Sequence, residues 1–413
     1  MKKIDIAVMG HGVVGSGVVE VLLKNHDMIE QKCKHDIFIK YILDLREFPE
    51  LPYSDKFIRD FDVIEKDPDV RVVVEVMGGV HPAYEFVSRL LKAGKSVCTS
   101  NKELVAEKGC ELLQIAEAHN VNFLFEASVG GGIPVLRPMS QCLCANHIEE
   151  VVGILNGTTN FILTKMIREG MSFSAALAMA QKLGYAERDP SADVDGHDAC
   201  RKICILASLA FGHHVYPEQV YTEGISQITL EDVAYAADYN SVIKLIGRTR
   251  AIGGGRIVAT VYPALVSRES QLATVDDVFN AILVRGDEVG DVMFYGRGAG
   301  KLPTASAVVA DVVDCVKHLQ ARKYLSWAEG QSGYVADHRE DTVSLYVYGE
   351  ADSRAAALSE LATVFPDARV LTRAGEGAHE LAFITPAGRE KELTAALGDL
   401  MNLKVKKTLR TLK

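Results

Sequence analysis

The chain has 413 residues, of which 48% are apolar and 24% are charged, and this balance is typical of a soluble globular protein with two or three domains. Its formal net charge of −10 argues against a nucleic-acid-binding surface and leaves small-molecule chemistry open. No apolar run approaches the roughly 18 residues that a membrane-spanning helix needs, so no membrane segment is expected.

Apolar strands alternate with amphipathic helices over the first third of the chain. The predicted strands are 4–9, 37–44, 70–77, 95–100 and 121–126, and helical patterns cover 16–31, 81–93 and 101–119. Strands this continuously apolar are typical of a parallel sheet that is covered on both faces. The pattern predicts an α/β fold of the Rossmann type, with a doubly wound parallel sheet.

The basic and apolar N-terminus resembles a signal peptide, but it passes directly into a glycine-rich turn and a helix. It is therefore interpreted as the first strand of a folded domain. The eight cysteines contain no Cys-x-x-Cys pair, and several lie in apolar segments. These features favour reduced cysteines in a cytoplasmic protein. Cys142 and Cys144 alternate as they would in a strand.

The pattern changes at 128–139, where glycines and prolines precede a mixed α+β segment that runs to about residue 299. The turn and long helix at 296–319 are expected to return the chain to the first domain. The proposed boundaries are 1–130 with 300–322 for dinucleotide binding, 131–299 for substrate binding and dimerisation, 323–341 for a linker, and 342–413 for a terminal module. The terminal module shows the order βαββαβ, which predicts a ferredoxin-like fold.

The sequence GHGVVG at 10–15 places a G-x-G-x-x-G pattern between the first strand and the first helix. Its glycines permit a tight turn, close approach of a pyrophosphate and close packing of helix on strand, and the phosphates then meet the helix N-terminus. The segment is predicted to bind a dinucleotide through Gly10, His11, Gly12, Val13, Val14 and Gly15.

Two residues after the second strand bear on the choice of cofactor. Asp44 stands where a carboxylate commonly holds the adenosine ribose of NAD, although it lies further from the glycines than usual. Arg46 is suited to the 2′-phosphate of NADP. The sequence leaves NAD and NADP as open alternatives.

The segment LGYAERDPSADVDGHDACRK at 183–202 is rich in charge and lies between two apolar helical stretches. It lacks the acidic spacing of an EF-hand, so a metal loop is not favoured. A pair such as Asp198 and Lys202, four residues apart on a helix, is by itself typical of a solvated salt bridge. The alternative is the floor of an active site.

Several motifs together resemble homoserine dehydrogenases. These are GHGVVG, TSNKELVA (99–106), EASVGGGIPVL (126–136), GILNGTTNFIL (153–163), the charged segment 183–202 and GAGKLPTASAVVAD (298–311). The resemblance covers residues 1 to about 320, and the terminal module is similar to the ACT domain of many members. It implies NAD(P)-dependent interconversion of L-aspartate 4-semialdehyde and L-homoserine in the aspartate pathway that leads to threonine, methionine and isoleucine.

The resemblance also implies roles for individual residues. Lys202 matches the proton donor and acceptor, and Glu187, Asp193 and Asp198 match the carboxylates around the amino-acid substrate. Lys102 matches a contact to the cofactor and the substrate, and Gly300 matches a glycine that touches the nucleotide. Thr158 and Asn160 are left open between contacts near the substrate and helix capping. A monovalent cation, usually sodium, is expected on backbone atoms of Glu126, Val129, Gly131 and Ile133.

Other functions are kept as alternatives. A nucleotide-sensing regulator would keep the fold without turnover, and an acylating aldehyde dehydrogenase would use a cysteine such as Cys98 or Cys142 as its nucleophile. The expected partner is a small amino-acid substrate rather than nucleic acid or a membrane. The family usually pairs through its middle domain, so a homodimer or homotetramer is expected by resemblance.

Overall fold

The computed structural model describes residues 2–321 and 325–412. The chain divides into two compact units. The first comprises Met1–Ile148, Cys204–Pro217 and Val284–Gln331, and the second comprises Glu149–Ile203, Glu218–Leu283 and Ser332–Lys413. Over the described residues, none of the helices is long and apolar enough to cross a membrane.

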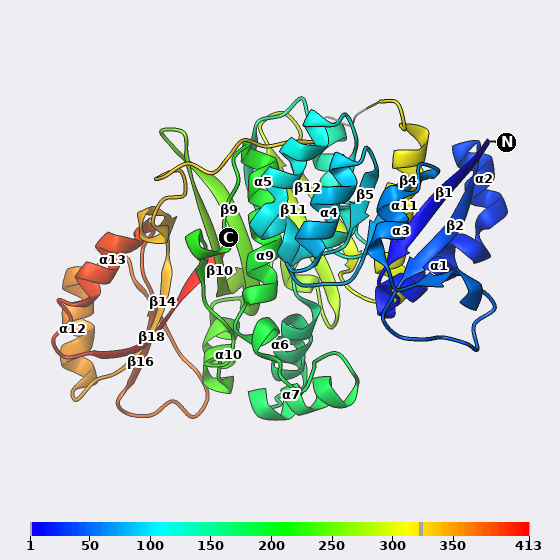
Figure 1. Cartoon of the computed structure of the whole chain (residues 1–413). Coiled ribbons are helices and arrows are strands. Elements are labelled where there is room, and N and C mark those ends of the chain that lie inside the picture. The colour runs from blue at the N-terminus through cyan, green and yellow to red at the C-terminus, as the bar shows by residue number, and fades with distance from the viewer. Residues whose placement is uncertain (1, 322–324, 413) are drawn as a thin grey trace. The chain divides into compact units, whose positions relative to one another are not determined.

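A parallel sheet forms the centre of the first unit (Figure 1). Its strands, in spatial order, are β3 (Phe57–Ile58), β2 (His35–Leu43), β1 (Lys2–Met9), β4 (Val70–Glu75), β5 (Ser96–Thr99) and β6 (Phe123–Leu124). This order reverses direction at β1 and β4, so the expected doubly wound Rossmann-type sheet is confirmed. The helices of this unit are α1 (Val13–Lys24), α2 (His26–Cys33), α3 (Phe61–Lys66), α4 (Ala83–Lys92), α5 (Lys102–Ala118) and α11 (Lys301–Lys317), and the unit also holds β12 (Gly290–Arg297).

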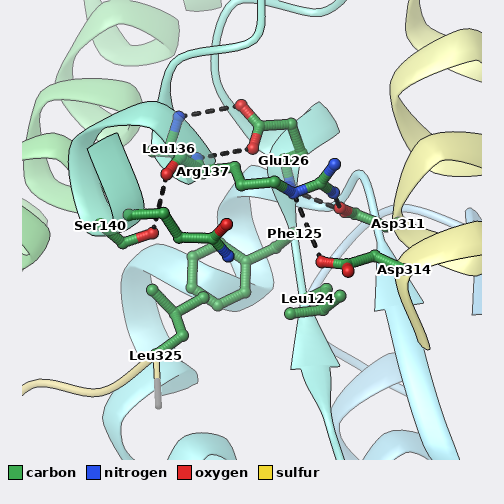
Figure 2. A pocket seen from close by; sticks show the side chains of 10 residues that line it. Leu124, Phe125, Glu126, Leu136, Arg137, Ser140, Asp311, Asp314 and Leu325 are labelled. Carbon is green, nitrogen blue, oxygen red and sulfur yellow. Dashed lines mark hydrogen bonds and ion pairs between the residues drawn. The ribbon is translucent and has the colours of Figure 1, made fainter. Parts of the chain in front are cut away.

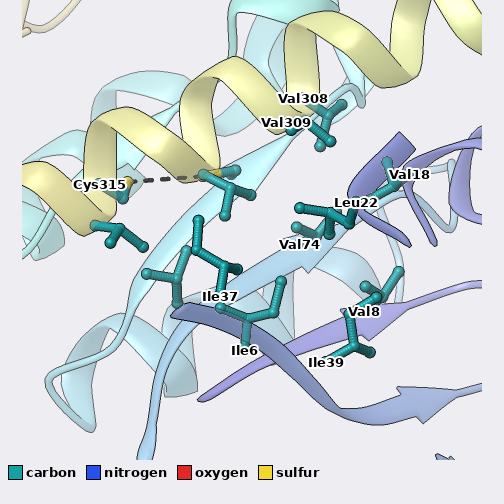
Figure 3. Close-up of a cluster of buried hydrophobic side chains, with 14 of the residues drawn as sticks. Ile6, Val8, Val18, Leu22, Ile37, Ile39, Val74, Val308, Val309 and Cys315 are labelled. Carbon is teal, nitrogen blue, oxygen red and sulfur yellow. Dashed lines mark hydrogen bonds between the residues drawn. The ribbon is translucent and has the colours of Figure 1, made fainter. Parts of the chain in front are cut away.

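Helix α11 packs on the same core as strands β1, β2 and β4. Val308 and Val312 of α11 are fully buried with Ile6 and Val74 of the sheet, and Figure 3 shows Val308 and Val309 above these strands. The helix therefore returns the chain to the first sheet, as the sequence predicted.

Three local predictions need correction. The stretch 16–31 forms two helices instead of one continuous helix, and these helices, α1 and α2, meet at Asn25. The strand expected at 121–126 is reduced to Phe123–Leu124, because Glu126–Ser128 already forms a 3₁₀ turn. Cys142 ends a π-helical turn at Pro138–Cys142, so Cys142 and Cys144 do not alternate in a strand.

The second unit is built on a mixed sheet. Its strands follow the order β11-β7-β9-β10-β18-β14-β16-β15, and β8 pairs with β10. Their bounds are β7 (Ile148–Ile154), β8 (Tyr221–Thr222), β9 (Ser241–Gly253), β10 (Arg256–Ser267), β11 (Phe279–Gly286), β14 (Leu345–Glu350), β15 (Arg369–Leu371), β16 (Glu380–Ile384) and β18 (Lys404–Leu412), with β13 (Thr342–Val343) and β17 (Gly388–Arg389) paired apart. Its helices are α6 (Gly157–Glu169), α7 (Phe173–Lys182), α8 (Ser191–Val194), α10 (Leu230–Asp238), α12 (Arg354–Val364) and α13 (Glu390–Leu397), and α9 (His197–Phe211) begins in this unit and ends in the first.

The C-terminal segment has the predicted order β14-α12-β15-β16-α13-β18. Helices α12 and α13 lie on one side of its strands (Figure 1), where Leu361 and Leu397 are buried against Val347 and Phe383. Strand β18 also pairs in parallel with β10, with Ala264 opposite Arg410, so the terminal strands continue the sheet of the unit. The ferredoxin-like element order is confirmed, whereas an ACT module stays a prediction.

Residues 323 and 324 of the proposed linker 323–341 lie outside the described residues, and so does residue 322 of the proposed nucleotide-binding domain. The described part is held in place. Trp327 is buried and donates its indole N–H to Nδ1 of His214 at 2.9 Å, and Val335 forms a bridge with Ile257. The domain boundaries themselves stay a prediction.

Candidate active site

The turn between β1 and α1 has the shape that a pyrophosphate requires. Gly10 has a φ of +97°, and a Cβ on Gly15 would lie 1.9 Å from the carbonyl oxygen of Gly10. Gly12 has open space where a side chain would stand, and it precedes α1 without a side-chain cap on the first amides. The amides at the start of α1 are thus oriented for an anion, and the sequence present fits a dinucleotide.

Asp44 and Arg46, which the sequence offered as alternatives, form one ion pair after β2. Oδ1 of Asp44 accepts the backbone N–H of Arg46 at 2.9 Å and its Nε–H at 3.0 Å, while Oδ2 accepts the guanidinium at 2.9 Å and the backbone N–H of His11 at 2.8 Å. Hydrogen bonds from Arg46 hold the pKa of Asp44 well below its usual range. The carboxylate and the guanidinium therefore form one hydrogen-bonded unit at the end of β2.

A pocket of about 440 Å³ lies beside this ion pair. It contains a second guanidinium, that of Arg59, which is paired with Glu47 at 2.7 Å. Sequence analysis did not find Arg59, because it lies thirteen residues beyond Arg46 in an irregular segment. The pocket is lined by Asp44, Arg46, Glu47, Phe48, Pro49, Ser54, Phe57, Ile58 and Arg59.

His11, in the middle of the fingerprint, is buried among aromatic rings. Its ring lies 4.7 Å from that of Phe48 and 5.0 Å from that of Phe57, measured between centroids. Burial lowers the pKa of His11, so its ring favours the neutral form. The backbone of His11 contacts Asp44, whereas the exposed Val13 begins the helix.

Lys102 is the first residue of α5. The helix is capped by Asn101, whose Oδ1 accepts the backbone N–H of Leu104 at 3.1 Å. Because α5 follows β5, Lys102 lies at the carboxyl edge of the parallel sheet, where ligands bind in such folds. Gly300 precedes α11 with a φ of +125°, and the next residue, Lys301, pairs with Glu20 of α1 at 2.7 Å.

In the second unit, Lys202 and Asp198 lie on α9 as a buried ion pair. Nζ of Lys202 is 2.6 Å from Oδ2 of Asp198, and it also donates to the carbonyl oxygen of Leu155 at 2.7 Å. Each residue is only 7% exposed. Burying two charges has a desolvation cost that a packing role does not require. The solvated salt bridge that the spacing alone suggested is therefore wrong.

Asn156 holds the two aspartates of this cluster. Its side-chain amide donates to Asp198 at 2.8 Å and to Asp193 at 2.6 Å, while its oxygen caps α6 by accepting the backbone N–H of Thr159 at 2.8 Å. Burial and then the charge of Asp198 raise the pKa of Asp193. Sequence analysis missed Asn156. The available signal was an asparagine directly before a helical segment, which is a preferred N-cap.

The remaining residues from the sequence divide between the cluster and its surroundings. Thr158 donates to the carbonyl oxygen of Tyr185 at 2.7 Å, next to the cluster. Asn160 instead donates to three carbonyl groups of the loop 275–279 and accepts Nζ of the buried Lys244 at 3.1 Å. Glu187 is exposed, and its carbonyl oxygen accepts the side-chain amide of Gln181 at 3.0 Å. The hydrogen-bonded cluster thus comprises Lys202, Asp198, Asn156 and Asp193.

The glycine-rich turn after β6 is held by buried acids. Oε1 of Glu126 accepts the backbone N–H groups of Val135 and Leu136 at 2.6 and 2.8 Å, and Oε2 accepts that of Arg137 at 2.7 Å. Figure 2 shows the bonds from Leu136 and Arg137. Asp311 of α11 accepts the backbone N–H of Glu126 and pairs with the Arg137 guanidinium. Burial raises the pKa of Asp311 to about 7.

The same acids line a cavity of about 290 Å³, together with apolar side chains (Figure 2). Inside the turn, the backbone N–H of Ser128 donates to the carbonyl oxygen of Phe125, and the backbone N–H of Ile133 donates to that of Gly130. The carbonyl groups expected to hold a cation belong to other residues of the turn, and the cation stays a prediction. Within residues 2–321 and 325–412, no cluster of three histidine, cysteine or acidic side chains could hold a metal ion.

The environment of Cys98 is the opposite of what a nucleophile needs. Its sulfur is buried in β5, 3.6 Å from that of Cys315 on α11. Burial raises the pKa of the Cys98 thiol well above its ordinary value, which disfavours the thiolate. Cys142 is exposed at the end of a turn. Neither cysteine provides support for an acylating mechanism.

Comparisons with known proteins identify the family of the chain. The family model for the NAD-binding domain of homoserine dehydrogenase matches residues 10–126, and that for homoserine dehydrogenase matches residues 134–313. The homoserine dehydrogenase of Neisseria gonorrhoeae is 38% identical over 96% of this chain and 95% of its own length. That of Bacillus subtilis is 43% identical over 78% of this chain and 74% of its own length.

Solved structures give the same result. A homoserine dehydrogenase from Thiobacillus denitrificans superposes with a TM-score of 0.90 at 35% identity, over 100% of this chain and 99% of that one. A hyperthermophilic archaeal homoserine dehydrogenase in complex with NADPH matches 76% of this chain and 97% of its own, with a TM-score of 0.64 and 26% identity. The chain therefore belongs to the homoserine dehydrogenase family, whose first domain binds a nicotinamide dinucleotide.

Proposed function

We propose that this chain catalyses the reversible reduction of L-aspartate 4-semialdehyde to L-homoserine with a reduced nicotinamide cofactor. When bound, the reduced cofactor would supply a hydride, an electron pair with its proton, for the new C–H bond at the aldehyde carbon. The carbonyl π electrons move onto oxygen, which then accepts a proton. The reverse reaction oxidises the alcohol and reduces the cofactor.

The buried ion pair of Lys202 and Asp198 is the observation that carries this proposal. Charge develops on the substrate oxygen during hydride transfer, and a positioned ammonium group stabilises that charge and supplies the proton. Asp198 keeps Lys202 oriented through the 2.6 Å contact, and Asn156 in turn orients Asp198. Lys202 is thus the proposed donor and acceptor of the proton.

The substrate also carries an α-ammonium group, which requires an anionic partner. Asp193 lies in the buried cluster, and Glu187 is exposed in the same charged segment. Carboxylates bind ammonium groups through short charge-assisted hydrogen bonds. We assign Asp193 and Glu187 to recognition of the amino-acid end of the substrate, and Lys102 to contact with the cofactor at the edge of the other sheet.

For the cofactor we propose a preference for NADP over NAD. The carboxylate of Asp44 already accepts four N–H groups, so few of its lone pairs remain for ribose hydroxyls. The neighbouring pocket adds the guanidinium of Arg59 to that of Arg46. Arginine side chains suit a phosphate because they donate two parallel hydrogen bonds.

A sodium ion on the backbone carbonyls of the glycine-rich turn, and assembly into a homodimer or homotetramer, are parts of the same proposal. The cation would order the turn that follows β6. Light scattering on the purified chain tests the assembly, and activity in sodium-free buffer tests the ion. A cytoplasmic location is part of the same proposal and is supported by buried cysteine thiols such as those of Cys98 and Cys315, as reducing compartments favour.

The alternative of a nucleotide-sensing regulator predicts cofactor binding without turnover. The complete set of Lys202, Asp198, Asn156 and Asp193 favours an enzyme, because a sensor has no need for a buried proton donor. An assay that follows reduced cofactor by absorbance with L-homoserine distinguishes the two. Turnover that depends on homoserine supports the enzyme, and binding of the cofactor without any turnover supports the sensor.

A further inference from the structure

Glu75, the last residue of β4, is a buried acid that the proposed chemistry does not use. The residue has no exposed surface and lies at the carboxyl end of the strand, paired in register with Met9 of β1 and Thr99 of β5. Its oxygens accept neutral donors: the backbone N–H of Met77 at 2.8 Å and the hydroxyl of Thr99 at 2.6 Å. Among the described residues no cation pairs with it, and a carboxylate without a cationic partner is costly to bury, so its position calls for a specific reason.

The contacts of Glu75 close a ring between two loops. Thr99 accepts the backbone N–H of Asn101 at 2.9 Å, and the side-chain amide of Asn101 donates to the carbonyl oxygen of Gly79 at 2.6 Å. The loop 76–79 and the start of α5 are therefore held together through one carboxylate. Burial raises the pKa of Glu75, and hydrogen bonds from Thr99 and from the backbone of Met77 and Gly78 oppose that rise.

This ring lies beside the dinucleotide turn. A Cβ on Gly10 would lie 3.0 Å from the carbonyl oxygen of Val76, so the loop after β4 contacts the first glycine of the fingerprint. Gly78 and Gly79 both have positive φ; open space exists where a side chain of Gly78 would stand, and a Cβ on Gly79 would lie 3.8 Å from the carbonyl oxygen of His81. The loop thus exposes backbone on the same edge of the sheet as the phosphate-binding turn.

The strand order decides which half of a dinucleotide meets this loop. The sheet reverses direction between β1 and β4, and a dinucleotide lies across the carboxyl ends of the strands at such a point. Asp44, after β2, lies on the side of the adenosine half. The loop after β4 and the start of α5 lie on the other side, where the nicotinamide half belongs.

We propose that Glu75 is a positioning residue for the nicotinamide half of the cofactor. It orients the loop 76–79 and the start of α5, and it leaves the adenosine half unaffected. A carboxylate is needed because its two oxygens accept donors on both sides. A glutamine cannot accept on both sides. With its N–H group toward Thr99, the hydroxyl must accept and its own proton loses its acceptor; with its N–H group toward the backbone amide of Met77, two donors face each other. The inference rests on the nicotinamide cofactor of the proposed function.

The test compares the equilibrium binding of the whole cofactor with that of its adenosine half. The full-length Glu75→Gln variant is titrated with NADPH and, separately, with adenosine 2′,5′-bisphosphate, which contains only the adenosine half. We expect the Kd for NADPH to rise about tenfold, as loss of one hydrogen bond to a charged group predicts, and the Kd for the bisphosphate to change less than about twofold. Equal changes for both ligands, or no change for either, overturn the assignment.

Two further variants make the result decisive. Thr99→Val removes the hydroxyl with little change of shape and should reproduce the selective loss even if Glu75→Gln does not fold. Ser96→Ala removes a buried hydroxyl at the other end of β5, where it accepts the backbone N–H of Asn122, and should leave both affinities unchanged. An unaltered protein that fails to bind NADPH would overturn the proposed function and this assignment together, whereas normal NADPH binding by the Glu75 and Thr99 variants overturns the assignment alone.

Discussion

The Nζ atom of Lys202 lies 2.6 Å from Oδ2 of Asp198, and both side chains are buried four residues apart on α9. An exposed pair with this spacing contributes only about 0.3–0.5 kcal/mol to stability. In the interior, the same two charges are expensive to desolvate and depend on further hydrogen bonds, here from Asn156 to Asp198 and from Lys202 to Leu155. These contacts keep the ammonium group of Lys202 in a fixed orientation, as the proposed role of proton donor requires.

Replacing Lys202 by alanine should lower kcat by roughly 10²–10⁴, the usual contribution of a positioned general acid. The variant should also be less stable by about 3–5 kcal/mol, since Asp198 would remain buried without its cation. Activity is therefore measured well below the Tm of the variant. Lys202→Arg keeps the positive charge but releases its proton far less readily, so recovery of turnover in that variant would show that charge alone is sufficient.

Asn156 and Asn160 form a matched pair on one helix segment. Asn156→Ala removes donors to Asp193 and Asp198 and should lower kcat/KM about 10–100-fold, because hydrogen bonds to charged groups contribute about 1.5–3 kcal/mol. Asn160→Ala loses contacts to the loop 275–279 and should lower Tm with little effect on kcat/KM. Steady-state kinetics and thermal unfolding of both variants check this. The account fails if the two variants show the same pattern.

The ion pair of Asp44 and Arg46 predicts opposite effects on cofactor choice. Asp44→Ala frees the guanidinium of Arg46 and removes a negative charge that would repel the 2′-phosphate of NADP. The value of kcat/KM should therefore fall for NAD and stay constant or rise for NADP. Arg46→Ala frees the carboxylate and should selectively reduce kcat/KM with NADP. Both variants are assayed with both cofactors. Equal losses for the two cofactors in each variant would mean that neither residue discriminates.

The raised pKa of Asp311 predicts that the stability of the fold depends on pH. Its pKa is about 7 in the folded chain, above the ordinary value of 3.8, so the folded state holds the proton more tightly than the unfolded state. Stability should therefore fall as pH rises from about 4 to about 7, by at most about 4 kcal/mol from this group. In Asp311→Asn this contribution is absent, and the difference in Tm between the two proteins should change with pH across that interval. A constant difference would contradict the raised pKa.

The terminal segment predicts weak or absent inhibition by L-threonine. An amino-acid carboxylate needs free backbone amides, which a Pro-Gly turn would expose, but after β14 the chain has Asp352, Ser353 and Arg354. Ser353 caps α12, with its hydroxyl accepting the backbone N–H of Ala356 at 3.4 Å, so that amide is already satisfied. A titration of activity with L-threonine decides this, and strong inhibition at sub-millimolar concentration would show that the prediction is wrong. Truncation is unsuitable as a test, because β18 pairs with β10.

Much of the fold follows from local pattern. Strands β1 and β4 were predicted within about two residues, because they are almost continuously apolar, and α5 was predicted from its Asn101 cap. The C-terminal βαββαβ order was also predicted. The pairing of β18 with β10 was not, since contacts between strands so distant in the chain leave no periodic signal.

The candidate site was predictable only in part, and for a related reason. Lys202 and Asp198 share a helix face, so their spacing indicates contact, but spacing does not show burial. Asn156 and Asp193 meet across different elements, and the ring around Glu75 joins the ends of two strands. Such contacts depend on tertiary packing, which the sequence of each segment does not contain.

The buried Lys202 is proposed to serve an NAD(P)-dependent dehydrogenase acting on homoserine. The most direct test follows the absorbance of reduced cofactor when the full-length chain is mixed with oxidised cofactor and L-homoserine, with L-serine as the control substrate. We predict rapid reduction that requires homoserine and is lost in Lys202→Ala. Cofactor that binds but is never reduced, or equal reduction rates in the unaltered chain and in Lys202→Ala, would contradict the account.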